Sequence, residues 1–395
     1  MELKDICQYV SDRVATTSLS TSNYISTENM LPNKGGVVIA NGLPVGNAVA
    51  FAKDDVLVSN IRPYFKKIWQ ANKNGGCSAD VLCFRKNENV DNKYFYYLLS
   101  QQSFFDHMML GSKGCKMPRG DKKQIMNWSF DLPSLEEQKR IADILSSLDS
   151  KIELNRCIND NLEQQAQTLF KSWLVDFDPF KNGKFVESEM GMIPEGWKVI
   201  SLQEYCQEIT RGNIPTYVEK SNRPILNQKV NKGVSLEKQY YKYNSENVEV
   251  SISKMAHYGD VLLNSLGQGT LGRVHLYKEK LGNVIIDQFI TILRTNLFVK
   301  SAYLSYTLNR PEYQTIIEGN VTGSTGMWVL TINNVRNIKI IVPKESCFLE
   351  LAPIINSIYQ AISNNTAEME QLCTLRDCIL PHLMSGELKI NDLNC

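Results

Sequence analysis

The sequence predicts an α+β protein in which two strand-rich domains are joined by two long helices that form an antiparallel coiled coil. Three observations predict this fold. Residues 133–180 place apolar side chains at alternating spacings of three and four, which is the pattern of a coiled-coil seam. Residues 343–388 repeat that pattern 210 positions later. The segments that precede the two stretches also resemble each other, so the chain consists of two copies of one plan with a pseudo-twofold relation.

The first domain is predicted at residues 1–133. Short apolar or alternating runs indicate strands at 36–40, 56–59 and 81–84, and a helical run follows at 94–99. Glycine and asparagine supply turn signals between these runs, at residues 33–36 and 73–76.

The first long helix is predicted for residues 134–180. A helix from Leu135 to Trp173 would extend about 60 Å at ~1.5 Å per residue, which is longer than a globular domain ordinarily needs. Asn155 and Asn159 fall on the line of its apolar seam. The apolar residues of the seam are Leu145, Leu148, Ile152, Leu162, Ala166, Leu169 and Trp173.

The second half repeats the order of the first. Residues 181–196 are turn-rich and are predicted to be a linker, residues 197–343 to be the second domain, and residues 344–395 to be the second long helix and a tail. The repeat is visible residue by residue: Asp-Val-Leu-Val at 55–58 corresponds to Asp-Val-Leu-Leu at 260–263. The strands predicted in the second domain are 261–264, 272–277, 284–294 and 337–342.

Each long helix has an asparagine at the corresponding position of its apolar seam. Asn155 corresponds to Asn365 at the same offset of 210 that relates Leu145 to Ile355. A seam asparagine costs stability but selects a partner and a register, because its amide must find another polar group. We therefore interpret Asn155 and Asn365 as register residues. The alternative is a partly exposed asparagine in an ordinary helix.

Composition bounds the function. The 395 residues carry a net charge of +1 and 43% hydrophobic residues, which is typical of a soluble globular protein. No run of about 18 apolar residues is found, and residues 1–10 do not resemble a signal peptide. The ten cysteines form no C-x-x-C pair, which favours free thiols in the cytoplasm and argues against a metal site. Any DNA-binding surface must be local, because the overall charge is near neutral.

Catalytic motifs are mostly missing. Asp178-Pro179-Phe180 lacks the second proline of an amino-methyltransferase loop and is interpreted as a helix stop. The G-x-G-x-x-G at 267–272 is followed by an alternating, strand-like run, so we interpret it as a turn rather than a dinucleotide loop. No other motif of a known catalytic site stands out.

Polar loops at matching places in the two halves are the candidate DNA-binding elements. Residues 111–123 contain five cations, and residues 320–328 are their small, hydrogen-bonding counterpart. Lys and Arg could hold phosphates, and Arg, Gln, Ser and Thr could contact base edges. The alternative is that these are solvated surface loops. The candidates are Arg62, Lys66, Lys67, Lys113, Lys116, Arg119, Lys122 and Lys123 in the first half, and Arg211, Lys232, Gln268, Arg273, Thr322, Ser324 and Thr325 in the second.

Four motifs closely resemble the specificity (S) subunit of type I restriction–modification enzymes. They are LPSLEEQKRIA at 132–142, AQTLFKSW at 166–173, IPEGW at 193–197 and LRDCILPHLMSGEL at 375–388. The resemblance covers the whole chain. Two departures are the absence of a Pro-Glu-Gly-Trp lead-in before the first domain and the short tail after Gly386.

The resemblance implies a function and a set of partners. Two target-recognition domains would each read one half of a bipartite site in double-stranded DNA. The paired helices would set the spacer between the half-sites and dock modification (methyltransferase) subunits, of which two are expected. Motor-nuclease restriction subunits would join for cleavage. S-adenosylmethionine, ATP and Mg would be bound by those partners. This chain would bind no cofactor and would have no catalytic residues of its own. The alternatives are a stand-alone DNA-modifying enzyme with an unrecognised site and a coiled-coil scaffold.

Overall fold

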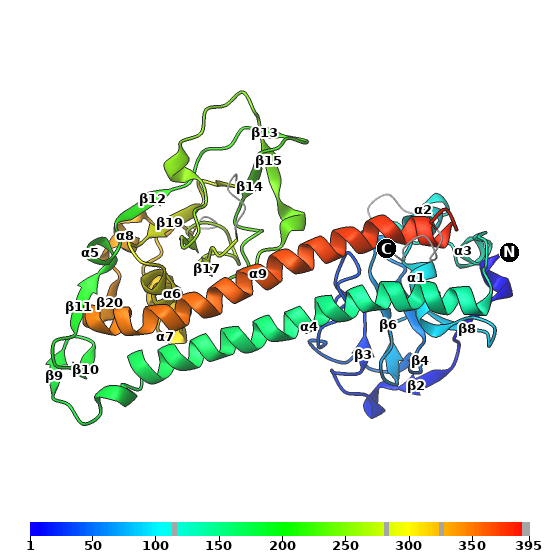
Figure 1. The fold of residues 1–395 in the computed structure, drawn as a ribbon, viewed down its shortest axis with the longest axis horizontal. Helices are drawn as coiled ribbons and strands as arrows, with labels where there is room; N and C mark the ends of the chain where they lie inside the picture. The colour runs from blue at the N-terminus through cyan, green and yellow to red at the C-terminus, as the bar shows by residue number, and fades with distance from the viewer. Residues whose placement is uncertain (113–116, 280–283, 324–327, 389–395) are drawn as a thin grey trace. The chain divides into compact units, whose positions relative to one another are not determined.

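The computed structural model describes residues 1–112, 117–279, 284–323 and 328–388 (Figure 1). The chain divides into two compact units. Unit 1 contains Met1–Leu154 and Glu368–Cys395, and unit 2 contains Asn155–Ala367. The predicted site residues Lys113, Lys116, Ser324 and Thr325 lie outside the described residues.

Unit 1 contains two four-stranded sheets. One has the antiparallel order β1-β8-β5-β6, and the other has the order β2-β4-β7-β3, in which β3 is parallel to β7. The strands are β1 (Cys7–Tyr9), β2 (Arg13–Ala15), β3 (Tyr24–Ile25), β4 (Asn47–Phe51), β5 (Val56–Ser59), β6 (Ile68–Gln70), β7 (Gly75–Cys77) and β8 (Val81–Lys86). The short helices are α1 (Asn92–Leu99), α2 (Gln102–Leu110) and α3 (Lys122–Met126).

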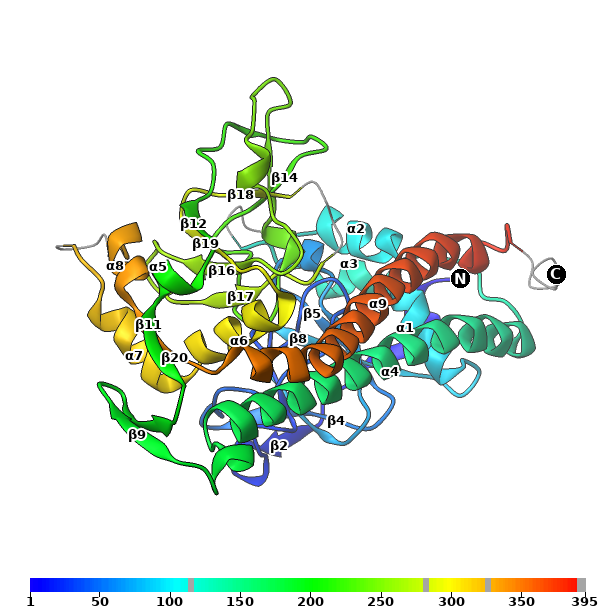
Figure 2. The same ribbon diagram turned by 60° about the vertical axis from the view of Figure 1, so that its left-hand side comes forward.

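Unit 2 repeats the first of these sheets. Its order β12-β19-β16-β17 corresponds to β1-β8-β5-β6, and it is accompanied by a mixed sheet β13-β15-β14-β18 and the pairs β11-β20 and β9-β10. The strands are β9 (Phe185–Ser188), β10 (Gly191–Pro194), β11 (Lys198–Ser201), β12 (Glu208–Arg211), β13 (Tyr217–Val218), β14 (Pro224–Leu226), β15 (Lys242–Asn244), β16 (Val261–Asn264), β17 (Val274–Leu276), β18 (Ile285–Ile286), β19 (Ile290–Arg294) and β20 (Lys339–Val342). The short helices are α5 (Leu202–Tyr205), α6 (Phe298–Leu308), α7 (Pro311–Gly319) and α8 (Ile332–Asn337), and Figure 2 shows α6 against the sheet that contains β16 and β17.

The central strand of each repeated sheet is apolar on both faces because each face has its own core. Val56 and Val58 of β5 pack in one cluster with residues of α1 and α2, and Leu57 packs in another. In β16, Val261 and Leu263 likewise belong to one cluster and Leu262 to another. A strand covered on both sides has a continuous apolar sequence. These two strands therefore coincide with their predicted bounds, 56–59 and 261–264.

The helices α4 (Leu135–Leu174) and α9 (Glu345–Met384) confirm the two predicted long helices. Within unit 1, Leu145 of α4 and Leu380 of α9 are buried in one core. Within unit 2, Phe170 of α4 and Ile355 of α9 are buried in another. In each unit the two helix segments run antiparallel, because contact positions rise along one helix as they fall along the other. None of the described helices has the length and apolar content needed to cross a membrane.

Several predicted elements differ in the structure. Residues 36–40 form no strand: only Val37 pairs, with Met30, while Ile39 is 69% exposed. The predicted strand 284–294 is interrupted, because the Asp287 carboxylate accepts a hydrogen bond from the Phe289 N–H and closes a turn. The predicted strand 272–277 is confined to β17, and 337–342 to β20. The predicted linker 181–196 contains the hairpin β9–β10.

The turn predicted at 73–76 is also wrong in part, because Gly75 and Gly76 belong to β7. A Cβ atom at Gly75 would lie 2.2 Å from the carbonyl oxygen of Asn23. The glycine therefore permits close approach of a neighbouring backbone, which is its alternative role within a strand.

Candidate nucleic-acid interface

In unit 1, the chain that leaves β5 lies beside the segment that precedes α3. Ile61 forms an isolated antiparallel bridge with Arg119, and the Arg62 N–H donates to the carbonyl of Pro118 at 2.9 Å. The Asn60 side chain donates to the carbonyl of Gly120 at 3.2 Å. We call residues 60–67 and 117–121 the first loop pair. This pairing brings the predicted residues Arg62, Lys66 and Arg119 together, although 57 positions separate Arg62 from Arg119.

The first loop pair holds an unusual backbone conformation. Arg62 and Lys66, each with φ of 50°, flank the 3-10 turn η3 (Pro63–Phe65). Asn33 and Lys34 also have positive φ, and their N–H groups donate to the carbonyls of Phe65 and Lys66 at 2.8 and 3.0 Å. A non-glycine residue in this region is strained by roughly 1 kcal/mol or more and persists only where neighbours hold it. Such strain often marks a functional site.

The remaining candidates of unit 1 differ in availability. Arg119 is 57% exposed and forms an ion pair with Asp80 at 3.1 Å. Lys122 and Lys123 are exposed at the start of α3. Lys67 instead donates from Nζ to the carbonyl of Thr27 at 2.6 Å, and burial lowers its pKa. Its ammonium group therefore contributes to the internal structure of the loop.

Unit 2 contains the equivalent arrangement. Leu266, just beyond β16, forms a bridge with Val329, and Val329 also pairs with Thr322 through two hydrogen bonds of 2.9 Å. We call residues 265–273, together with 321–323 and 328–330, the second loop pair. Val329 corresponds to Arg119 at the offset of 210. Gln268 and Thr322 are exposed on this loop pair.

The glycine motif of unit 2 forms the turn between β16 and β17. Gly267, Gly269 and Gly272 have φ of 110°, 73° and 85°, which favours glycine. No helix begins within or directly after the motif. Because a dinucleotide fingerprint places its glycines at a helix N-terminus, the interpretation of 267–272 as a turn is confirmed.

The basic candidates of unit 2 are mostly bound internally. Arg211 donates to the carbonyl of Leu330, and burial lowers its pKa. Arg273 donates to the carbonyls of Gly269 at 3.0 Å and Asn231 at 3.3 Å. Lys232 lies 3.5 Å from Glu237. These contacts hold the loops in place, so exposed hydrogen-bonding side chains rather than free cations characterise the second loop pair.

A repeated ion pair links two strands of each repeated sheet, at the end of β5 and of β16 opposite to the loop pair. Arg85 donates to both carboxylate oxygens of Asp55 at 2.8 and 2.7 Å, and Arg294 donates to those of Asp260 at 2.8 and 3.1 Å. Asp55 and Asp260 are buried. The sequence analysis matched the two Asp-Val-Leu segments but did not predict these pairs. The recurrence of both Asp and Arg at corresponding positions was the available signal.

Asn365 forms a hydrogen bond with Asn159 of the other helix, whereas the residue to which it corresponds in the repeat is Asn155. Asn365 donates to the side-chain oxygen of Asn159 at 2.9 Å, and Asn159 donates to Thr366 at 3.3 Å. Asn155 is buried, with 1% exposure. The sequence analysis placed Asn159 on the seam but did not select it as the partner of Asn365. The role of Asn155 and Asn365 in selecting the register stays a prediction.

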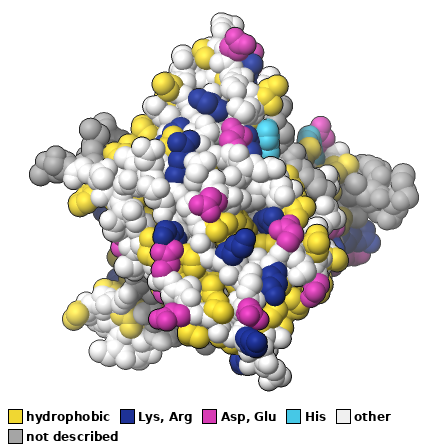
Figure 3. All heavy atoms as spheres, turned by 90° about the vertical axis from the view of Figure 1, so that its left-hand side faces the viewer, with side chains coloured by type: hydrophobic (Ala, Val, Ile, Leu, Met, Phe, Trp, Pro, Cys, Tyr) yellow, Lys and Arg dark blue, Asp and Glu magenta, His cyan; other side chains and the backbone are white. Residues whose placement is uncertain are grey.

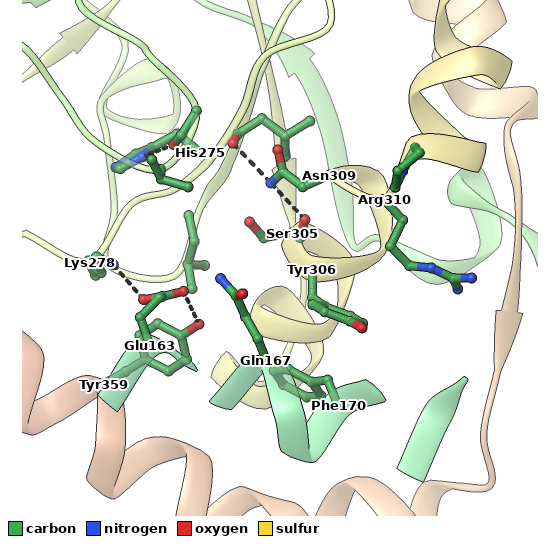
Figure 4. Close-up of a pocket in the computed structure, with 15 residues that line it drawn as sticks. Glu163, Gln167, Phe170, His275, Lys278, Ser305, Tyr306, Asn309, Arg310 and Tyr359 are labelled. Carbon is green, nitrogen blue, oxygen red and sulfur yellow. Dashed lines mark hydrogen bonds and ion pairs between the residues drawn. The ribbon is translucent and has the colours of Figure 1, made fainter. Parts of the chain in front are cut away.

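A cavity of about 400 Å³ in unit 2 is lined by residues outside the second loop pair (Figure 4). Its cations already have partners: Glu163 accepts hydrogen bonds from Lys278 and the Tyr359 hydroxyl, each at 3.0 Å, and Arg310 lies 3.5 Å from Glu312. Burial lowers the pKa of His275 to about 4, so its ring is neutral near pH 7. The cavity therefore offers no cluster of free cations for a phosphate backbone.

In unit 1, the position that corresponds to this cavity is filled by side chains. Asp149 accepts hydrogen bonds from the Tyr97 hydroxyl at 2.6 Å and from Arg376 at 2.7 Å.

Across the described parts of the chain, no group of three or more His, Cys, Asp or Glu residues could hold a metal ion. On the face drawn in Figure 3, Lys and Arg side chains lie among Asp and Glu side chains. The loop pairs are therefore the best candidates for ligand contact.

Comparisons with known proteins give one consistent family. The family described as "Type I restriction modification DNA specificity domain" matches residues 1–164. The type I restriction enzyme MjaIX specificity subunit of Methanocaldococcus jannaschii is 27% identical over 317 residues, which cover 78% of this chain and 71% of the relative. The type I restriction enzyme HindI specificity subunit of Haemophilus influenzae is 24% identical over 455 residues, covering 98% of each chain.

A solved structure supports the same fold. The crystal structure of the type I restriction–modification S subunit from M. genitalium aligns with a TM-score of 0.52 and 16% identity. The alignment covers 97% of this chain and 95% of that one. At this identity the likeness supports the architecture, and the residues that act must be argued from this chain.

Proposed function

We propose that this chain, a member of the family of type I restriction–modification specificity subunits, recognises a bipartite DNA sequence through its two loop pairs. The observation that carries the proposal is the repetition of the loop pair. The Ile61–Arg119 bridge in unit 1 and the Leu266–Val329 bridge in unit 2 hold loops at corresponding positions of the two copies. Two related units of one chain are suited to reading two half-sites.

The two loop pairs would divide phosphate and base contacts differently. In unit 1, Lys66, Arg119 and Lys122 would contact phosphates, which supply affinity and make it dependent on salt. In unit 2, Gln268 and Thr322 would contact base edges, where each good pair contributes about 1–3 kcal/mol of discrimination. This division is supported by the exposure of these side chains, of which only Lys66 is half-buried, and by the internal bonding of Lys67, Arg211 and Arg273.

The long helices would dock the modification subunits and set the spacer between the half-sites. Each helix exposes large apolar side chains that its partner helix does not cover. Apolar residues exposed on a helix favour a protein–protein contact. They are Leu135 and Leu154 on α4 in unit 1, Leu375 on α9 in unit 1, and Ile158, Leu349 and Ile354 in unit 2.

The chemistry would belong to the partners. Two methyltransferase subunits would bind S-adenosylmethionine, and motor-nuclease subunits would bind ATP and Mg. This chain would supply recognition without a catalytic residue or cofactor of its own, in the cytoplasm where the DNA is found. The purified chain, mixed with S-adenosylmethionine and DNA, is expected to transfer no methyl groups.

Methylome sequencing of the host with and without this gene tests the proposal. Loss of one bipartite methylated motif is expected on deletion, and an unchanged methylome would overturn the assignment. Exchanging residues 1–133 for the corresponding domain of another specificity subunit should alter only one half of that motif. Deleting one heptad from both long helices should shorten the spacer and leave both half-sites unchanged.

A further inference from the structure

Both loop pairs expose a large aromatic side chain. In unit 1, Tyr64 is 49% exposed and Phe65 is 38% exposed, and their ring centroids are 4.7 Å apart. In unit 2, Trp328 is 53% exposed. Trp328 directly precedes Val329, the residue that bridges to Leu266, so it lies on the second segment of its loop pair, whereas Tyr64 and Phe65 lie on the first segment of theirs. Single exposed apolar residues are common, but their recurrence on corresponding loop pairs suggests a shared use.

The aromatic pair of unit 1 is held by its backbone. Tyr64 and Phe65 lie in η3, which is closed by the hydrogen bond from the Lys66 N–H to the Pro63 carbonyl at 2.8 Å. The Phe65 carbonyl also accepts from the Asn33 N–H. Of the six non-glycine residues with positive φ in the described parts of the chain, four belong to this turn and the segment that braces it. A turn fixed in this way presents its rings with little conformational entropy left to lose on binding.

The aromatic residue of unit 2 is fixed by its neighbours. Val329 is hydrogen-bonded in both directions to Thr322, and the Leu330 N–H donates to the Ser265 carbonyl at 2.9 Å. The Leu330 carbonyl in turn accepts from Arg211, a residue of β12. The backbone that carries Trp328 is therefore tied to the sheet of unit 2, while the indole is exposed.

The surroundings of Tyr64 and Phe65 suit DNA. Arg62 and Lys66 flank the Tyr64–Phe65 turn, and Arg119 lies on the paired segment. Met117, which is 50% exposed, adds a flexible apolar side chain to the same loop pair. Proteins that distort DNA combine cations for the phosphates with apolar side chains that enter between bases. A protein partner would be expected to contact the apolar side chains without requiring the cations.

We propose that Tyr64, backed by Phe65, and Trp328 are DNA-unstacking residues, each stacking on or inserting between bases of the half-site read by its own unit. This inference rests on the proposed function and adds a means of recognition that base-edge contacts do not provide. Pyrimidine–purine steps unstack most readily, so each half-site is expected to contain a TA or CA/TG step where the ring enters. The step would be selected by its deformability rather than by hydrogen bonds.

Fluorescence of 2-aminopurine tests the proposal, because its emission rises when the base is unstacked. The assembled complex of this chain with its methyltransferase subunits is bound to DNA carrying the methylated motif found by methylome sequencing. The probe replaces single adenines of either strand, other than the methylated adenines. This placement separates the signal from any base extrusion by the methyltransferase subunits. A rise at one position in each half-site is expected.

Variants assign each signal to its residue. Tyr64→Ala should abolish the rise in one half-site and weaken DNA binding roughly tenfold to a hundredfold, as removal of a base–aromatic stack does. Trp328→Ala should do the same in the other half-site only. Tyr64→Phe and Trp328→Phe, which keep a ring, should retain the rise. Val45→Ala and Ile252→Ala, which shorten exposed apolar residues outside the loop pairs, should change neither signal nor affinity.

The outcomes separate this proposal from the proposed function. Failure of the wild-type complex to bind the motif would refute both. Normal binding without a rise at any tested position, or a rise that survives Tyr64→Ala and Trp328→Ala, would refute unstacking and leave the proposed function intact. If an alanine variant fails to assemble with the methyltransferase subunits while the assembled fraction binds DNA normally, the aromatic surface is a protein contact and the proposal is wrong.

Discussion

Replacing Asp260 by Asn should destabilise the protein, because it removes the buried carboxylate that compensates Arg294 and leaves the partly exposed Glu208 as the remaining ionic partner. The Asp260 side chain is 2% exposed and that of Arg294 is 14% exposed. Arg294 donates to both Asp260 oxygens, to Glu208 at 2.8 Å and to the carbonyl of Met255 at 2.8 Å. The guanidinium group therefore links β12, β16 and β19 to the segment that contains Met255.

The magnitude follows from this burial. Breaking a buried ion pair by removing one partner costs about 3–5 kcal/mol, since the remaining charge stays desolvated. Because Glu208 still pairs with Arg294 in the variant, we expect a loss near the lower end of this range. The pair of Arg119 with Asp80 is a matched control, because both side chains are more than one-third exposed and such a pair contributes about 0–1 kcal/mol. Asp80→Asn should therefore reduce the free energy of unfolding by no more than about 1 kcal/mol.

Urea denaturation of the full chain, followed by circular dichroism, measures these differences. Asp260→Asn should lower the denaturation midpoint far more than Asp80→Asn does. The double variant Asp260→Asn/Arg294→Met should cost less than the sum of the single variants, because it leaves no uncompensated buried charge. Equal effects of Asp260→Asn and Asp80→Asn, or strictly additive effects in the double variant, would refute the reasoning.

Three further predictions follow from other contacts. Asn365→Leu should lower the free energy of unfolding by about 1–3 kcal/mol, because it leaves the Asn159 side-chain oxygen without its donor. The double variant Asn159→Leu/Asn365→Leu should recover most of that loss, since it replaces both polar partners by apolar groups. A double variant as unstable as the single one would contradict this. Lys66→Ala should reduce the slope of log affinity against log salt concentration by about 0.9 and leave the sequence preference unchanged. Lys67→Ala should leave the slope unaltered, because the Lys67 amine donates to the Thr27 carbonyl. Equal slopes for the two variants would argue against a phosphate contact by Lys66. Burial lowers the pKa of His275 to about 4, so as the pH falls the unfolded chain binds a proton at this ring before the folded chain does. The free energy of unfolding should therefore fall by up to about 3 kcal/mol as the pH drops from 6.5 to 4. His275→Asn should flatten that part of the pH–stability curve, and an unchanged curve would mean that the ring is not buried as a neutral group.

The elements that sequence patterns predicted well are those whose burial is set by neighbours in sequence. Along α4 and α9 the apolar spacing repeats over 40 residues in each helix, and in β5 and β16 four consecutive residues are buried. The second sheet of unit 1 had no comparable signal, because its strands are two to five residues long and include the Gly-Gly-Cys of β7. Residues 36–40 were predicted as a strand from apolar content alone, but Val38 and Ile39 are exposed.

The sequence predicted loops and candidate residues for the site, and their contact with DNA stays a prediction. The loops at 111–123 and 320–328 were selected because they occupy corresponding places in the two halves. The choice of residues was made by charge and hydrogen-bonding capacity, and neither shows which side chains already have a partner inside the fold. Tyr64 and Trp328 were not selected, because only charged and hydrogen-bonding side chains were considered as DNA contacts.

The sequence by itself determined the duplicated plan, the two long helices and the position of each loop pair along the chain. It did so because periodicity and repetition are properties of neighbouring or regularly spaced residues. Only the tertiary structure decided that Lys67 and Arg211 are bound to internal carbonyls, that Asn365 meets Asn159, and that the rings of Tyr64 and Trp328 remain exposed. Their surroundings come from segments 40 to 206 positions away, which no local pattern encodes.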